Sequence, residues 1–105
     1  MAQFTVYRNK SQRTRSTFPL LLDVQSDLLD QLHTRVVIPL TKTSALAKKP
    51  LSNLTPALKF DGETYVLVTP QLAGIARSDL GAPAGSVAGQ RQAILAALDF
   101  LLVGF

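Results

Sequence analysis

The sequence predicts a mainly β domain that ends in an α-helix, and three observations point to this fold class. Polar and apolar residues alternate with a period of two near the N-terminus, which is typical of a strand. The dipeptide Asp61-Gly62 separates two apolar runs, the pattern of a tight β-hairpin. Toward the C-terminus, apolar residues recur at helical spacing. A chain of 105 residues, 47% apolar and 17% charged, has room for one domain, residues 1–105, around one core.

The first two strands are expected to form a hairpin. In Gln3–Arg8 the side chains alternate between two faces, so this segment predicts a strand that ends near Arg8. The polar segment Asn9–Thr17 then leads to a second β-like run, Phe18–Gln25. Pro19 stands near the start of that run, where its missing N–H group removes the least pairing.

A third strand is expected to begin with the β-branched run Arg35–Ile38. The segment Asp27–Leu32 before it is too short to predict a secure helix. Pro39 is expected either to end regular pairing or to mark a sheet edge. We interpret Lys42–Pro56 as an irregular connection with a single helical turn around Ser44–Ala47.

The strongest local signal is the hairpin centred on Asp61-Gly62. Apolar residues precede this dipeptide in Ala57–Phe60 and follow it in Tyr65–Val68. The turn types that match the twist of the strands need positive φ, which Asp and Gly tolerate.

The segment between the hairpin and the final helix gives weaker signals. Pro70 closes the second hairpin strand, and Gln71–Ile75 is expected to add one short element. Gly81–Gly85 contains only Gly, Ala and Pro, which predicts a linker. Ser86 is expected to be the N-cap of the helix that follows.

The final helix has one apolar face and an unusually apolar end. The predicted core-facing stripe comprises Val87, Ile94, Leu95, Leu98, Leu101, Leu102 and Phe105. Arg91 falls within it and is expected to reach water near the helix start. Because successive helical residues turn by about 100°, Phe100 and Val103 point away from this stripe. The last two turns therefore predict a dimer interface, a binding partner or both, and the alternative is core packing with a frayed end.

The sequence offers little material for catalysis or for a metal or cofactor site. It has no cysteine, and its one histidine, His33, has no His, Cys or acid at ligand spacing. Asp23, Asp27 and Asp30 lie close in sequence, but carboxylates at a strand end and a turn more often cap turns than share a proton. The glycines near residue 85 lack the lysine of a phosphate-binding loop. We expect no catalytic residue, no metal and no cofactor.

Nothing in the sequence predicts a membrane-spanning or secreted protein. The longest apolar stretch, Ala93–Phe105, contains Asp99 and is shorter than the roughly 20 residues of a membrane-spanning helix. Met1–Lys10 alternates polar and apolar residues, unlike a secretory signal. We expect a cytoplasmic protein.

The net charge of +4 is concentrated near the N-terminus. No acidic residue precedes Asp23, so the four net positive charges come from Arg8, Lys10, Arg13 and Arg15. Such a patch attracts nucleic acid or an acidic protein segment, and the alternative is a solvated hairpin loop.

Four segments give the chain a resemblance to a known family. They are Gln3–Tyr7 (QFTVY), Leu22–Asp30 (LDVQSDLLD), Arg35–Leu40 (RVVIPL) and the apolar helix that finishes with Val103-Gly104-Phe105. Together they resemble the CcdB family over essentially the whole chain. The resemblance implies a homodimer of SH3-like, partly open antiparallel barrels with a C-terminal α-helix. It also implies a toxin of a type II toxin–antitoxin system that performs no chemistry itself. Such a toxin binds the DNA gyrase A subunit and traps the gyrase–DNA cleavage complex.

The resemblance also implies partners and site residues. The gyrase-binding positions correspond to Leu28, Leu29, Asp99, Leu102, Val103, Gly104 and Phe105. A CcdA-type antitoxin would wrap the dimer with a disordered tail that folds on binding, and we expect the basic patch Arg8, Lys10, Arg13 and Arg15 to meet its acidic segment. No membrane and no sequence-specific nucleic acid is expected as a partner of the toxin alone.

Two departures from the best-known family member bear on gyrase affinity. Val103 stands where that protein has Trp, and Asp99 stands where it has Asn. A valine cannot stack on an arginine as an indole can, a contact worth about 0.5 to 2 kcal/mol. We therefore expect a gyrase affinity different from that of a relative with the tryptophan.

Two other functions remain open from the sequence. MazF-type endoribonuclease toxins resemble CcdB in fold, and Arg8, Arg13 and Arg15 would then act on RNA. A small nucleic-acid-binding barrel would instead use the basic loop with Tyr7 and Phe18 as stacking platforms.

Overall fold

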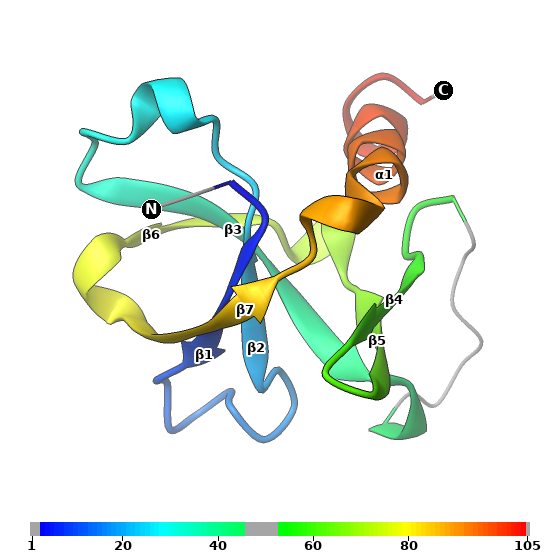
Figure 1. The fold of residues 1–105 in the computed structure, drawn as a ribbon, viewed down its shortest axis with the longest axis horizontal. Helices are drawn as coiled ribbons and strands as arrows, with labels where there is room; N and C mark the ends of the chain where they lie inside the picture. The colour runs from blue at the N-terminus through cyan, green and yellow to red at the C-terminus, as the bar shows by residue number, and fades with distance from the viewer. Residues whose placement is uncertain (1–2, 46–52, 105) are drawn as a thin grey trace.

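The computed structural model describes residues 3–45 and 53–104 (Figure 1). Its strands in this part of the chain are β1 (Thr5–Asn9), β2 (Leu20–Asp23), β3 (Thr34–Lys42), β4 (Ala57–Phe60), β5 (Glu63–Leu67), β6 (Ala73–Ala76) and β7 (Leu80–Ser86). Short 3-10 turns connect them: η1 (Asp27–Leu29), η2 (Thr43–Ala45), η3 (Thr69–Gln71), η4 (Arg77–Asp79) and η5 (Ala88–Gln90). The helix α1 (Arg91–Val103) follows them.

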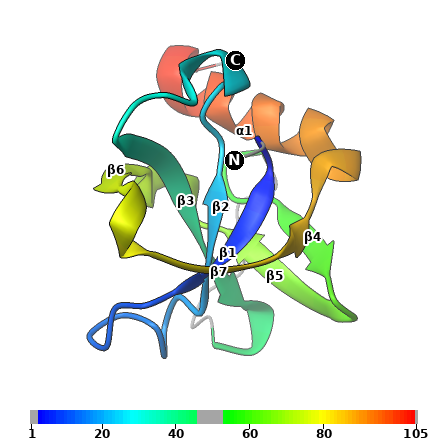
Figure 2. The ribbon, with the colours of Figure 1, turned by 60° about the vertical axis from the view of Figure 1, so that its left-hand side comes forward.

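The strands form one antiparallel sheet in the order β4-β5-β3-β2-β1-β7, and β6 pairs with the first half of β3. This sheet curls into a half-barrel, and α1 lies along one side of it (Figures 1 and 2). The prediction of a mainly β domain with a C-terminal helix is confirmed. So is the hairpin of β1 and β2, in which Val6 pairs with Leu22.

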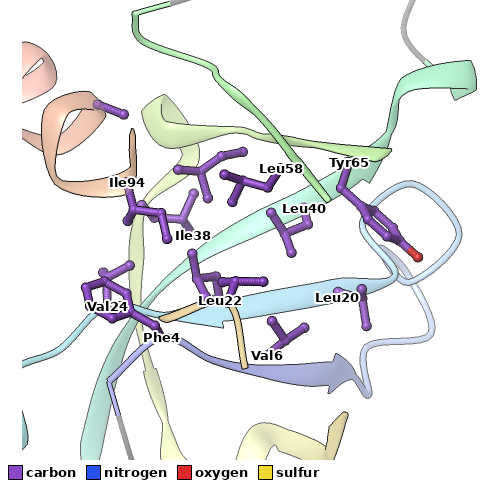
Figure 3. Packing of buried hydrophobic residues seen from close by; sticks show 13 residues of the cluster. Phe4, Val6, Leu20, Leu22, Val24, Ile38, Leu40, Leu58, Tyr65 and Ile94 are labelled. Carbon is purple, nitrogen blue, oxygen red and sulfur yellow. The ribbon is translucent and has the colours of Figure 1, made fainter. Parts of the chain in front are cut away.

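The main core fills the space between the curled sheet and α1 (Figure 3). It combines side chains from β1 to β5 with Ile94 and Ala97 of the helix, both fully buried. A second, smaller cluster of Tyr7, Val37 and Leu80 lies on the other face of the sheet. Both faces of β1 are therefore buried, because Val6 and Tyr7 belong to different clusters.

The expectation that Pro39 ends pairing or marks an edge is wrong. Pro39 lies inside β3, in the middle of the sheet, opposite Leu21 of β2. On its other side β3 changes partner, because residues 34–37 pair with β6 and residues 40–42 pair with β5. The Pro39 carbonyl accepts a hydrogen bond from the Val68 N–H (3.0 Å) on that side. Since N–H and C=O of one strand residue point the same way, the missing Pro39 N–H would also face Val68, whose carbonyl instead accepts from the Gln71 N–H (2.9 Å) and is not left unpaired.

The Asp61-Gly62 hairpin is confirmed. Asp61 has a φ of 52° and Gly62 a φ of 79°, and Phe60 pairs with Glu63 across the turn. Both central residues thus adopt the positive φ that the two-residue turn requires. The irregular connection begins one residue later than predicted, because Lys42 still belongs to β3 and pairs with Tyr65. The turn η2 and the segment from residue 53 onward lie in the described residues, and the rest of the expected turn at Ser44–Ala47 falls outside them.

The prediction of a linker at Gly81–Gly85 is wrong. These residues belong to β7, which pairs with β1 through irregular registers such as Val6 with Gly85 and Asn9 with Leu80. A Cβ atom on Gly81 would lie 2.5 Å from the Arg8 carbonyl oxygen, and one on Gly85 would lie 2.8 Å from the Phe60 ring. The strand is composed of small residues because its neighbours approach the backbone closely, so it has no alternating apolar signal.

The start of the final helix also differs from the expectation. The Ser86 hydroxyl accepts a hydrogen bond from the Ala88 N–H (3.1 Å), but the N-cap of η5 is Val87, and α1 begins only at Arg91 with Gln90 as its N-cap. Gln90, just before α1, bonds the β4 backbone instead: its Oε1 accepts from the Lys59 N–H (3.0 Å) and its Nε2 donates to the Lys59 carbonyl (2.8 Å). A side-chain amide thus pairs with an edge strand as a neighbouring strand would.

The predicted stripe of α1 is correct at its centre and wrong at its end. Ile94 is buried, and Leu95 and Leu98 pack partly buried against the core. Leu102, however, is 74% exposed. Since Leu102 stands about 80° around the helix from Ile94, it lies at the margin of the face that meets the sheet. Arg91 is exposed, as expected for a side chain that reaches water.

Candidate functional site

Within residues 3–45 and 53–104, the large apolar side chains that are exposed form two groups. Leu28, Leu29 and Leu32, in and after η1, are 94%, 49% and 47% exposed. At the end of α1, Phe100, Leu102 and Val103 are 37%, 74% and 60% exposed. Figures 1 and 2 show η1 and the end of α1 at the same edge of the molecule, and Figure 1 shows them apart along its long axis.

The sequence-predicted gyrase-binding residues fall into these same two groups. Leu28 and Leu29 lie together on η1, while Asp99, Leu102, Val103 and Gly104 lie together at the end of α1. Phe105 lies outside the described residues. Leu32 and Phe100 extend the two groups; the sequence signal for Phe100 was its position away from the core-facing stripe of the helix, and that for Leu32 was its apolar character beside predicted site residues.

The η1 loop is held by hydrogen bonds to its polar groups. The Ser26 hydroxyl accepts from the Leu28 N–H (3.2 Å), and Gln25 Nε2 donates to the Leu29 carbonyl (3.0 Å). The backbone N–H of Gln3 donates to Asp27 Oδ1 (2.7 Å). The loop backbone is therefore tied to the body of the protein while its leucine side chains face solvent.

A buried ion pair lies under this loop. Asp23 and Arg35 are both fully buried, and Arg35 Nε donates to Asp23 Oδ2 (2.9 Å), with Nη2 at 2.6 Å from the same oxygen. Arg35 Nη1 also donates to Asp30 Oδ1 (3.2 Å) in the loop. Burial raises the pKa of Asp23, against the lowering effect of hydrogen bonds from the Gln25 N–H and Arg35. Of the three aspartates expected to cap turns, Asp23 accepts from the Gln25 N–H two residues on (2.9 Å), whereas Asp27 accepts from the distant Gln3 N–H and Asp30 from the Arg35 side chain.

The end of α1 is closed by a glycine in a left-handed conformation. Gly104 has a φ of 80°, and its N–H donates to the Phe100 carbonyl (3.0 Å). This C-cap ends the helix cleanly, directly after Leu102 and Val103. Asp99 is exposed one turn before Val103, so a carboxylate borders the apolar end.

The basic patch occupies the end of β1 and the connection from β1 to β2. Its four side chains, Arg8, Lys10, Arg13 and Arg15, are all exposed. The loop is ordered by Asn9, whose Nδ2 donates to Thr14 Oγ1 (2.9 Å) and to the Phe18 carbonyl (2.8 Å).

A groove of about 640 Å³ lies beside this loop. Its apolar lining includes Phe18, Leu21, Val37, Pro39 and Ile75. Polar residues, among them Lys10 and Asp79, complete the lining. Tyr7 is 5% exposed in the second core cluster, so it cannot serve as a stacking platform for a base.

The described residues hold no group of three or more His, Cys, Asp or Glu side chains that could bind a metal ion. His33 is exposed. In the same part of the chain, no helix has the length and apolar character that crossing a membrane requires.

Sequence reasoning missed the polar groups that support η1. Gln25 and Arg35 lie within strand-like segments, where a buried polar residue leaves no pattern of its own. Arg77 donates from Nη1 to the Asp30 carbonyl (2.8 Å), a contact between residues 47 positions apart, and no local sequence signal predicts it.

A comparison with protein-family models identifies the family of the chain. Residues 3–104 match the model described as CcdB protein, which covers nearly the whole chain. The chain therefore belongs to the CcdB family, whose members are toxins of toxin–antitoxin systems that act on DNA gyrase.

Proposed function

We propose that this toxin binds the DNA gyrase A subunit and traps the gyrase–DNA cleavage complex without performing chemistry itself. The observation that carries the proposal is the exposure of large apolar side chains at the positions that the family resemblance assigns to gyrase, above all Leu28, Leu102 and Val103. Apolar side chains that the chain itself leaves uncovered gain hydrophobic free energy only against a partner.

The two exposed groups are also suited to binding because their backbones are ordered. Hydrogen bonds tie the η1 loop to the protein, and α1 keeps its helical form up to the Gly104 cap. Groups that are already in place lose little conformational entropy when a partner binds. Because the Asp99 carboxylate lies beside Val103, the partner is expected to present an apolar surface that is bordered by a cation or a hydrogen-bond donor.

We also propose that the chain forms a homodimer, as the resemblance implies. A dimer would carry two η1 loops and two helix ends, so that one particle could engage a partner at more than one point. Sedimentation equilibrium should give twice the monomer mass at micromolar concentration, and a monomer mass throughout would contradict the proposal.

The antitoxin is proposed to bind at the groove beside the β1–β2 loop. The groove offers an apolar lining, and four exposed cations lie in or next to the loop that borders it. An acidic amphipathic segment, disordered when free, complements both properties. The proposed antitoxin-binding residues are Arg8, Lys10, Arg13 and Arg15.

Calorimetric titration against the dimerisation domain of the gyrase A subunit tests the gyrase site. We expect saturable binding by the intact protein, a large loss on deletion of residues 103–105, and a loss of at least tenfold for Leu28→Ala, which truncates an anchor side chain. Gln92→Ala, an exposed position in the first turn of the same helix, is the control and should bind normally. If the intact protein does not bind, an RNA-cleavage assay tests the ribonuclease alternative.

Titration with the C-terminal peptide of a CcdA-type antitoxin tests the basic patch. Reversing two charges, in Arg13→Glu with Arg15→Glu, should weaken binding about tenfold or more at low salt and less at high salt, because exposed charges are screened. Lys59→Glu, which reverses one exposed cation on β4, is the control for each of the two single reversals Arg13→Glu and Arg15→Glu. Equal effects at both sites would contradict a local antitoxin-binding patch.

A further inference from the structure

Three carbonyl groups between residues 30 and 33 are bound by a single residue, Arg77 at the start of η4. Its backbone N–H donates to the His33 carbonyl (2.9 Å). Its Nη1 donates to the Asp30 carbonyl (2.8 Å) and, at longer distance, to the Leu32 carbonyl (3.4 Å). The guanidinium thus binds the start and the middle of the segment that returns from η1 to β3, and the Arg77 backbone N–H binds its end.

This segment directly follows the exposed leucines. Leu28 and Leu29 lie in η1, Asp30 follows directly, and Leu32 is the third exposed leucine of this loop. From the sheet side, Gln25 holds the Leu29 carbonyl and Arg35 holds the Asp30 side chain. Arg77 therefore completes, from η4, a set of polar contacts that fixes the loop backbone while the leucines stay in solvent.

Arginine is suited to this role for a chemical reason. Its planar guanidinium carries five N–H donors, so one side chain can reach more than one carbonyl with little internal freedom, and it stays charged. Lysine has the charge but not the fixed geometry. Arg77 is also half-buried, unlike the fully buried Arg35, so its side chain can be truncated without opening the core.

We propose that Arg77 is a positioning residue for the display of Leu28 and Leu29, a role that rests on the proposed binding of gyrase through these leucines. Without the guanidinium, the backbone of residues 27–33 samples more conformations in the free protein. The partner must then order the loop when it binds, and the affinity falls by that cost.

A double-mutant cycle with the gyrase A dimerisation domain tests this inference. Arg77→Ala should weaken binding about threefold to tenfold, the cost of ordering a few residues. In the background of Leu28→Ala with Leu29→Ala, the same substitution should have little effect, because the side chains that it positions are absent. Arg77→Lys should fall between the intact protein and Arg77→Ala. Arg91→Ala, an exposed arginine at the far end of α1, is the control.

Hydrogen exchange of the free protein gives a second readout that needs no gyrase. The N–H groups of Leu29, Asp30 and Leu32 donate within the loop, so they should exchange faster in Arg77→Ala than in the intact protein. Strand amides such as that of Leu22 should exchange at an unchanged rate.

The outcomes separate the two proposals. An equal loss of affinity with and without the leucines, or unchanged loop exchange, would overturn the positioning role of Arg77. Normal gyrase binding by the double leucine variant would instead overturn the part of the proposed gyrase site that lies on η1. Faster loop exchange together with a loss of affinity only when the leucines are present is the expected result.

Discussion

Removing the carboxylate of Asp23 should destabilise the protein strongly, because it leaves the Arg35 guanidinium buried without its main partner. Asp23 accepts from Arg35 Nε (2.9 Å) and from the Gln25 N–H (2.9 Å), and both charged side chains are fully buried. In Asp23→Ala, Arg35 keeps its contact with Asp30 (3.2 Å), whose side chain is 44% exposed. Removing one partner of a buried ion pair costs about 3 to 5 kcal/mol. That is a large part of the roughly 5 to 15 kcal/mol that stabilises a typical domain.

Urea unfolding followed by circular dichroism measures this loss. All variants are compared at one protomer concentration, so that association contributes equally. The matched control is Asp27→Ala, an exposed aspartate that accepts one backbone hydrogen bond, which should cost about 1 kcal/mol.

The same measurement on the double variant Asp23→Leu with Arg35→Met replaces the ion pair by apolar side chains. It separates the net contribution of the ion pair to stability from the cost of leaving one buried charge without a partner. This double variant should recover most of the stability that Asp23→Ala loses, because an ion pair of this kind contributes little more than well-packed apolar groups. A loss below about 1 kcal/mol for Asp23→Ala would refute the reasoning, since an uncompensated buried charge costs more than that.

Three further predictions concern other parts of the molecule. Gln90→Leu keeps the side-chain size but removes both bonds to the Lys59 backbone, so urea unfolding should show a loss of about 1 to 2 kcal/mol. Burial raises the pKa of Tyr7 above its ordinary value of 10.0, so the unfolded chain loses this proton first and the stability of the folded state falls as the pH rises past 10.0. Tyr7→Phe has no proton to lose at this position, so this part of the alkaline loss of stability should be absent. Unfolding measured from about pH 9 to about pH 11, the range around the ordinary tyrosine pKa, checks this. Val103→Trp, at an exposed position, should tighten gyrase binding about twofold to thirtyfold in calorimetry, and an unchanged affinity would sink the cation–π explanation.

Features that depend on neighbours in the chain could be predicted from the sequence. The turn at Asp61-Gly62 needs positive φ at two adjacent residues, which only a few residue types tolerate. The helix was predicted by its spacing of apolar residues, and its excess of apolar surface predicted an uncovered end, which Phe100 and Val103 provide, whereas the exposure of Leu102 was not predicted by the spacing. The exposed leucines of η1 entered the site only through the family resemblance.

Features that depend on distant segments were decided by the tertiary structure alone. Gly81 and Gly85 form a strand because β1 and Phe60 approach their backbone. Pro39 fits inside β3 because the Val68 carbonyl beside it accepts from the Gln71 N–H instead. Arg77 binds carbonyls some 45 positions earlier in the chain. Local patterns record the conformation that each residue prefers, whereas pairing, burial and long-range hydrogen bonds exist only once the chain has brought distant residues together.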